Sequence, residues 1–125
     1  MKTFNIEYET FVTVTEEDIT DIIITAIEGG ISYWACLDNT GDEFINAPES
    51  EPTAITAAKI LLNNGTIKLI DEIDDDTEHN LTLKKLLDGI KAYANSTGKF
   101  DMNDLDAIMA DEIVQFAIFC EVIYG

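Results

Sequence analysis

The chain contains no arginine, and its only cationic side chains are seven lysines, set against 25 aspartates and glutamates. The formal net charge at pH 7 is therefore −18. A surface with this charge repels nucleic acid and anionic lipid, because both are negatively charged, and it attracts basic protein surfaces. We expect a basic protein surface as the partner, with no direct contact to nucleic acid or to a membrane.

Motifs for catalysis are equally scarce. The only histidine is His79, and the chain has neither a GxSxG sequence nor a glycine-rich phosphate loop. A phosphate clamp would have to use scattered lysines, since there is no arginine to bind phosphate through two parallel hydrogen bonds. Carboxylates occur throughout the chain, and in such numbers they indicate a solvated surface rather than an acid–base pair in a cleft. The sequence therefore predicts a protein that is not an enzyme.

Long apolar runs are absent as well. The longest, around residues 22–24 and 116–118, are far shorter than the roughly 20 residues that cross a bilayer. Residues 1–11 contain no apolar segment behind Lys2 of the kind that a signal peptide needs. We therefore expect a cytoplasmic protein, and its length favours a single domain that spans residues 1–125.

Apolar content, by contrast, is that of an ordinary globular protein. Hydrophobic residues make up 46% of the chain and include six Phe, four Tyr and one Trp. This is enough for a packed core and argues against an acidic disordered tail. The acidic side chains are therefore carried on a folded scaffold, which holds them at a fixed spacing.

The apolar spacing along the chain predicts both strands and helices. Alternating and β-branched residues predict strands at residues 4–14, 31–37, 66–70 and 80–82. Helical spacing predicts helices at about residues 16–28, 53–62, 83–95 and 105–120. This order indicates an α+β domain, in which a mostly antiparallel sheet of about three to four strands packs against about four helices.

Two local features refine this expectation. Thr15 is expected to cap the first helix, with Asp18 three residues further on in the manner of a capping box, and Gly29 and Gly30 are expected to end it. Tyr33 and Trp34 lie in a short apolar strand, so we expect both side chains in the core.

Residues 71–78 form the most acidic stretch, with six acidic residues in eight positions, and we expect them to form a solvated turn. Such a run usually serves only to keep a surface solvated, but it can also be one edge of a face that docks on a basic protein. The net charge favours the docking role. The acidic residues that we expect at the contact lie in this run and on the first predicted helix: Asp71, Glu72, Asp74, Asp75, Asp76, Glu78, Glu16, Glu17, Asp18 and Asp21.

The two cysteines, Cys36 and Cys120, are far apart and form no CxxC pair. They could form a disulfide, share a metal ion or be two buried thiols, and buried thiols are the default for a chain without a secretion signal. If the elements that carry them pack together, their thiolates could hold zinc with His79 or an acidic side chain as a further ligand. The acidic run does not match the calcium-loop pattern, because His79 and Lys85 stand where glycine and glutamate are required. Zinc is thus the candidate cofactor.

Three stretches of the chain resemble a known family: residues 12–19 (VTVTEEDI), 26–34 (AIEGGISYW) and 110–125 (ADEIVQFAIFCEVIYG). They resemble small acidic proteins carried by phages, prophages and other mobile elements of Gram-positive bacteria, while the middle of the chain diverges. The matching residues belong to a capped helix, a Gly-Gly stop and a terminal apolar helix. The resemblance therefore implies relatives without identifying a site.

Small acidic proteins of mobile elements in turn resemble anti-CRISPR inhibitors, some of which block Cas9 by occupying its basic nucleic-acid channel or its recognition lobe. The resemblance implies a phage protein that binds a type II, Cas9-like CRISPR effector nuclease in the host cytoplasm. It would block target DNA binding or cleavage without catalysis, since a folded polyanion can compete with a DNA duplex. The alternative is a metal-stabilised structural or regulatory module of a mobile element, for example a homodimer, that binds another basic protein.

Overall fold

Five α-helices and three strands succeed one another in the part of the chain that the computed structural model describes, residues 2–4 and 11–125. In chain order they are α1 (Glu16–Thr25), β1 (Ala35–Leu37), α2 (Asp42–Ile45), α3 (Thr53–Leu62), β2 (Thr66–Asp71), β3 (Thr77–Thr82), α4 (Leu83–Thr97) and α5 (Ala107–Phe119). A π-helical turn, η1 (Ala26–Gly30), extends α1, and a 3-10 turn, η2 (Met102–Asp104), precedes α5. The predicted α+β class is confirmed.

The sheet is antiparallel, with the strand order β1-β2-β3. Its central strand, β2, alternates between the two faces: Ile67, Leu69 and Asp71 are buried, while Thr66 and Lys68 are exposed. Side chains two residues apart on a strand point to the same face. The alternation therefore carries the Asp71 carboxylate to the inner face, along with the apolar residues of the strand.

The start of α1 confirms the predicted capping box. The Thr15 hydroxyl accepts a hydrogen bond from the Asp18 amide (3.1 Å), and the Asp18 carboxylate accepts one from the Thr15 amide (3.0 Å). Each bond satisfies an amide that the first helical turn leaves without a partner, and such a cap contributes about 1 kcal/mol. The helix then buries Ile19, Ile22 and Ile23 against the rest of the core.

Two of the predicted strands differ from the structure. Residues 5–10 of the predicted strand 4–14 lie outside the described residues, and residues 11–14 form no strand. Residues 31–34 form a turn, in which the Ala35 amide donates to the Ile31 carbonyl oxygen (2.8 Å), so only Ala35–Leu37 pairs with β2. In the other direction, β3 begins at Thr77, earlier than predicted, because Thr77 pairs with Asp71.

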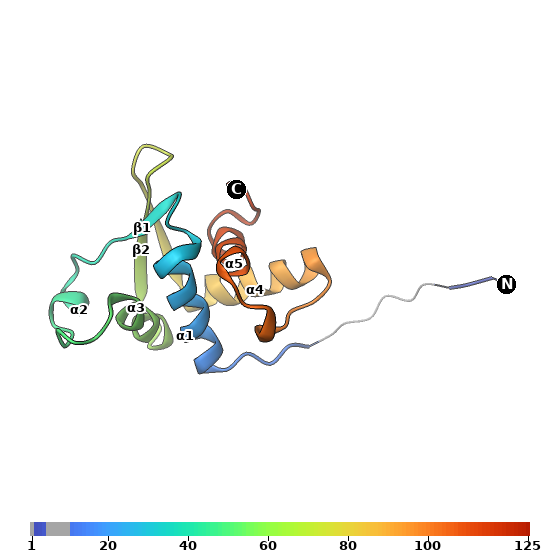
Figure 1. Cartoon of the computed structure of the whole chain (residues 1–125), viewed down its shortest axis with the longest axis horizontal. Coiled ribbons are helices and arrows are strands. Elements are labelled where there is room, and N and C mark those ends of the chain that lie inside the picture. The colour runs from blue at the N-terminus through green and yellow to red at the C-terminus, as the bar shows by residue number, and fades with distance from the viewer. Residues whose placement is uncertain (1, 5–10) are drawn as a thin grey trace.

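The core lies where the helices meet the inner face of the sheet. Trp34 is fully buried there, as predicted, and its ring packs against those of Phe119 and Tyr124 (centroids 5.5 and 5.3 Å away). The prediction for Tyr33 was wrong, because its side chain is half exposed at the end of the turn. Figure 1 shows α4 and α5 to one side of the sheet, with the β2–β3 hairpin projecting beyond the helices.

The helices α4 and α5 are tightly packed at Gly89. A Cβ atom placed there would lie 2.7 Å from the Ile113 carbonyl oxygen and 2.8 Å from the Ala117 amide nitrogen. These are backbone atoms, so the two helices would have to separate. Only glycine therefore fits at this crossing.

Gly89→Ala is expected to lower the free energy of unfolding by about 1–3 kcal/mol through overpacking, despite the higher helix propensity of alanine. Urea denaturation followed by circular dichroism measures the change. Gly29→Ala is the matched control, because a Cβ atom there meets no atom within 4 Å. It should be neutral or slightly stabilising. Equal stability of the two variants would contradict the close packing at Gly89.

Candidate functional site

The protruding end of the β2–β3 hairpin, which comprises the loop and the start of β3, carries five of the predicted contact residues (Figure 1). We call them the acidic hairpin, and all five are exposed: Glu72, Asp74, Asp75, Asp76 and Glu78. An apolar side chain, Ile73, lies among them and is 57% exposed. The loop therefore presents a dense negative charge together with a patch of apolar surface.

The acidic hairpin has a defined turn. Asp75 and Asp76 both have positive φ angles, 53° and 56°. The Thr77 amide donates to the Asp74 carbonyl oxygen (3.0 Å), which closes the turn. Positive φ at both central positions is typical of the primed turns that suit the twist of a hairpin, and aspartate tolerates this conformation better than most residues. The backbone that carries the charges at the tip thus has one defined conformation.

Asp71, by contrast, does not belong to the exposed surface, so its predicted role as a contact residue was wrong. It is only 1% exposed, because the alternation of β2 points it inward. Its Oδ1 accepts hydrogen bonds from the amides of Ile73 (3.1 Å) and Asp74 (3.0 Å), and its Oδ2 accepts one from the Tyr124 hydroxyl (2.8 Å). Asp71 therefore organises the base of the acidic hairpin from within.

The same contacts set the ionisation of Asp71. Burial by itself would raise the pKa of Asp71, but the hydrogen bonds from Tyr124 and from the amides of Asp74 and Ile73 outweigh it and hold the pKa below its usual value. The hydrogen bond between Tyr124 and Asp71 raises the pKa of the Tyr124 hydroxyl to about 12, and burial makes a smaller contribution. At neutral pH the pair is thus a neutral donor and a charged acceptor, which is among the stronger kinds of hydrogen bond.

A second buried polar side chain fixes Tyr124 in turn. Gln115 on α5 is fully buried, and its Oε1 accepts from the amides of Ile123 (2.8 Å) and Tyr124 (2.9 Å). Its Nε2 donates to Asp111 Oδ1 (2.9 Å) and to the Tyr124 carbonyl oxygen (3.2 Å). The C-terminal segment is therefore attached to α5 on one side and to the acidic hairpin on the other.

Asp111, also on α5, completes this network. It is 7% exposed and accepts from the Tyr33 hydroxyl (2.6 Å) and from Trp34 Nε1 (2.8 Å) as well as from Gln115. Burial and the hydrogen bond to Asp111 raise the pKa of Tyr33 to about 12, with a smaller contribution from the charge of Glu112. Neither Asp111 nor Gln115 was among the site residues predicted from the sequence. Their positions among the apolar residues of the last helix could have indicated that both side chains are buried.

The acidic residues of the first helix do not join the acidic hairpin. Glu16, Glu17 and Asp21 are exposed, and Asp18 is engaged in the capping box. In Figure 1 α1 begins at the lower end of the molecule, whereas the hairpin tip is at the upper end. The predicted contact residues therefore form two separate acidic regions rather than one continuous face.

The candidate zinc ligands are also placed differently from the expectation. Cys36 and Cys120 are both free and exposed, so the default prediction of two buried thiols was wrong. Cys36 alternates with the inward-facing Ala35 on β1, and Cys120 caps α5 beyond its buried stripe with a φ of 62°. Partial desolvation of its thiol, together with Glu72, nevertheless raises the pKa of Cys36.

His79 packs edge-on against the Phe119 ring, and its Nε2 lies 3.5 Å from Asp71 Oδ2. Across residues 2–4 and 11–125, no three His, Cys, Asp or Glu side chains are grouped so that they could hold a metal ion. The described residues therefore supply no ligand set for the zinc that the sequence suggested. That candidate cofactor stays a prediction.

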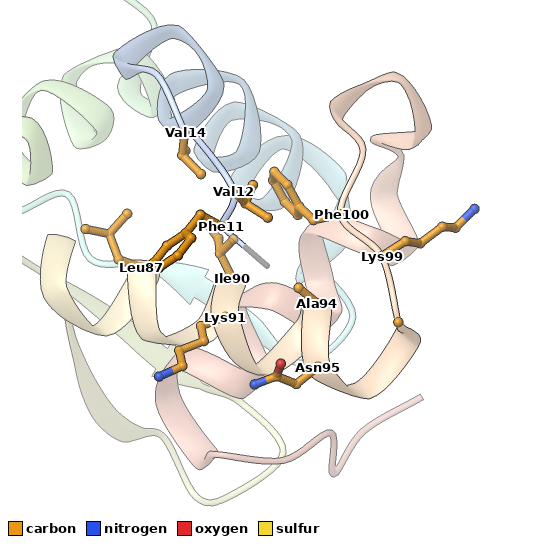
Figure 2. Close-up of a pocket in the computed structure, with 11 residues that line it drawn as sticks. Phe11, Val12, Val14, Leu87, Ile90, Lys91, Ala94, Asn95, Lys99 and Phe100 are labelled. Atoms are coloured by element: carbon orange, nitrogen blue, oxygen red, sulfur yellow. The ribbon is translucent and has the colours of Figure 1, made fainter. Parts of the chain in front are cut away.

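A groove of about 940 Å³ runs along α4 (Figure 2). Its apolar lining comes from α4 and from the segments before α1 and after α4: Leu87, Ile90, Phe11, Val12 and Phe100. Lys91 and Lys99 also line the groove, and Figure 2 shows their ammonium groups pointing away from its apolar middle. Two cations have the wrong sign for attracting a basic partner, so we place the contact with such a partner elsewhere.

Comparisons of the chain with protein-family models, with curated proteins and with solved structures found no match. The resemblance to small acidic phage proteins therefore stays a prediction. None of the helices in the described residues is long and apolar enough to cross a membrane.

Removing the Tyr124 hydroxyl should loosen the acidic hairpin. Tyr124→Phe deletes one hydrogen bond to the Asp71 carboxylate, which corresponds to a loss of about 1.5–3 kcal/mol of stability. Hydrogen exchange should accelerate most at the amides of Ile73 and Asp74, which share that carboxylate. Tyr93→Phe, on α4, is the control outside the network. Unchanged exchange at the hairpin amides in Tyr124→Phe would show that Tyr124 does not position the hairpin.

The lowered pKa of Asp71 predicts an acid-dependent contribution to stability. A carboxyl group with a folded-state pKa below its unfolded value of about 3.9 stabilises the fold above that pH, and the contribution is lost as the pH falls through the folded pKa. Asp71→Asn should therefore be less stable than the parent protein at pH 7, by about 1–3 kcal/mol. Urea unfolding at pH 7, 5 and 3 should show this difference shrinking below about pH 4. A constant difference would rule out the proposed ionisation.

Proposed function

We propose that the chain is a non-catalytic inhibitor that binds a basic protein surface through its acidic hairpin. One observation carries the proposal: the acidic hairpin presents five exposed carboxylates and the exposed Ile73 side chain, and Asp71 holds the backbone of its turn. Charges in a fixed arrangement suit the recognition of a basic groove, because little conformational freedom is lost when they dock.

The overall charge supports this role. A net charge of −18 attracts a basic surface over about 8 Å, the screening length at physiological ionic strength, and thereby accelerates association. Ile73 adds apolar contact at short range, which salt does not screen. Raising the salt concentration should therefore slow association more than it speeds dissociation.

The partner that we propose is a type II, Cas9-like CRISPR effector nuclease in the cytoplasm of a bacterial host. Its support is the resemblance of both ends of the chain to small acidic proteins of mobile elements, together with the basic channel in which such effectors hold nucleic acid. Carboxylates at the sites of DNA phosphates would block target binding or cleavage. This activity needs no catalytic group. The two buried carboxylates of the described residues, Asp71 and Asp111, are occupied by hydrogen bonds within the fold.

Cleavage of a target plasmid by guide-loaded Cas9, titrated with the protein, tests the partner. Loss of cleavage near one equivalent is expected, since a competitor for the DNA channel acts stoichiometrically when it binds tightly. The titration should shift to higher protein concentration in high salt. Full cleavage at a large excess of the protein would remove Cas9 as the partner.

Two variants that each remove three negative charges test whether the acidic hairpin is the binding surface. Asp74→Asn, Asp75→Asn and Asp76→Asn together remove three charges from the acidic hairpin, and asparagine still tolerates the positive φ of the turn. Glu16→Gln, Glu17→Gln and Asp21→Asn remove three charges from α1 and spare the capping box. The hairpin variant should raise the half-inhibitory concentration about tenfold or more, and the α1 variant by much less. Equal effects would mean that only net charge matters.

A further inference from the structure

A hollow of about 580 Å³ opens beside the buried network, between the end of η1, the first half of α5 and the C-terminal segment. Its rim is apolar and accessible: Tyr33 is 50% exposed, Ile108 69% and Val122 41%. Gly29 and Gly30 form one wall. A Cβ atom on Gly29 would meet no atom within 4 Å, whereas one on Gly30 would lie 2.7 Å from the Ala107 carbonyl oxygen.

Two carboxylates line the same hollow. Asp111 is 93% buried, and its three hydrogen-bond donors, the Tyr33 hydroxyl, the Trp34 indole and the Gln115 amide, are all neutral. None of the ion pairs formed within the described residues includes Asp111. Glu112 follows it and is partly exposed. The hollow therefore combines negative charge with an aromatic ring and aliphatic walls.

We propose that this hollow accepts the guanidinium group of an arginine side chain of the basic partner. The inference rests on the proposed function, because it names the chemistry that the partner contributes. The aliphatic part of the arginine would pack against Ile108 and Val122, its plane would stack on the Tyr33 ring, and its charge would face Asp111 and Glu112. A planar, weakly hydrated cation suits such a site better than an ammonium group, which is compact and strongly hydrated.

The groove along α4 differs from this hollow in its charge. It is larger, but Lys91 and Lys99 line it and give it the opposite charge (Figure 2). A cationic side chain should therefore bind in the hollow beside Asp111 rather than in the groove along α4. The acidic hairpin would attract the partner over a distance, and the hollow would select one side chain at contact.

The probe is Nα-acetyl-arginine amide, titrated into the 15N-labelled protein and followed by amide chemical shifts. Saturable shifts are expected at Gly29, Gly30 and Ile108, with a dissociation constant in the millimolar range for so small a ligand. Nα-acetyl-citrulline amide has nearly the same shape without the charge, and it should shift these amides at least fivefold less at equal concentration. The corresponding lysine amide should bind more weakly than the arginine amide.

Two variants make the test specific to the hollow. Gly29→Trp places a large side chain where the structure has open space, and Glu112→Gln removes a charge without changing the shape. The first should abolish the saturable shifts, and the second should weaken binding about fivefold. Gly41→Trp is the control, because a Cβ atom there also meets no atom within 4 Å and Gly41 lies outside the hollow. Equal shifts with citrulline, or full binding by Gly29→Trp, would overturn the proposal.

The hairpin triple variant separates this inference from the proposed function. It should leave the arginine titration of the hollow unchanged, because its three charges lie on a different loop. If the protein binds arginine but inhibits no cleavage, the proposed function is contradicted and the arginine site is not. Inhibition that Gly29→Trp and Glu112→Gln leave intact would sink the arginine site alone.

Discussion

The hydrogen bond from the Tyr124 hydroxyl to the Asp71 carboxylate joins the sheet to the C-terminal segment, and the geometry of the acidic hairpin depends on it. Asp71 holds the amides of Ile73 and Asp74 with one oxygen and the Tyr124 hydroxyl with the other. Gln115 fixes the backbone on either side of Tyr124. A carboxylate that is 1% exposed is costly unless its oxygens are bonded, so the loop, the strand and the tail hold one another in place.

Local sequence patterns predicted the elements that depend on neighbouring residues. The Thr15–Asp18 cap and the strand that became β2 follow from spacings of two to three residues, and both are present. Helical spacing also predicted the last helix, which buries Met109, Ile113 and Ala117 but leaves Ile108 exposed. The α+β class follows from their order. Thr77 was not predicted to lie in a strand, because an isolated acidic run resembles a solvated turn and the pairing partner of Thr77, Asp71, belongs to the same run.

The buried polar network was harder to predict because its members are distant in sequence. Asp71 continues the inward alternation of Ile67 and Leu69, and this alternation could have predicted its burial. The prediction was missed because Asp71 begins a run of six acidic residues in eight positions, which resembles an exposed turn. Its partner Tyr124 is 53 residues away, and no local pattern could pair them. On α5, Asp111 and Gln115 stand four residues apart on one helical face among buried apolar side chains, a spacing that does indicate a shared polar contact. Cys36 is exposed because it alternates with the buried Ala35 on β1, and Cys120 is exposed because α5 ends just before it. The sequence only weakly encodes where a helix ends.

The charges of the molecule as a whole attract a basic partner, whereas particular sites on its surface recognise that partner. Acidic residues occur at both ends of the molecule, so the net charge can steer a basic partner from many directions. In the acidic hairpin, charge combines with a fixed turn and the exposed Ile73 side chain. The hollow beside Asp111 adds a shaped site for one cationic group. A partner that satisfied both would be held far more selectively than one attracted by charge alone.

Hydrogen exchange of the protein, free and bound to guide-loaded Cas9, tests the central claim most directly. We expect the amides of residues 72–77 to be protected in the complex, together with those of Gly29 and Gly30, and those of α4 to be unchanged. Protection confined to the groove along α4, with the hairpin exchanging as in the free protein, would contradict the assignment of the acidic hairpin as the binding surface. The absence of any protection at stoichiometric concentrations would contradict the assignment of Cas9 as the partner.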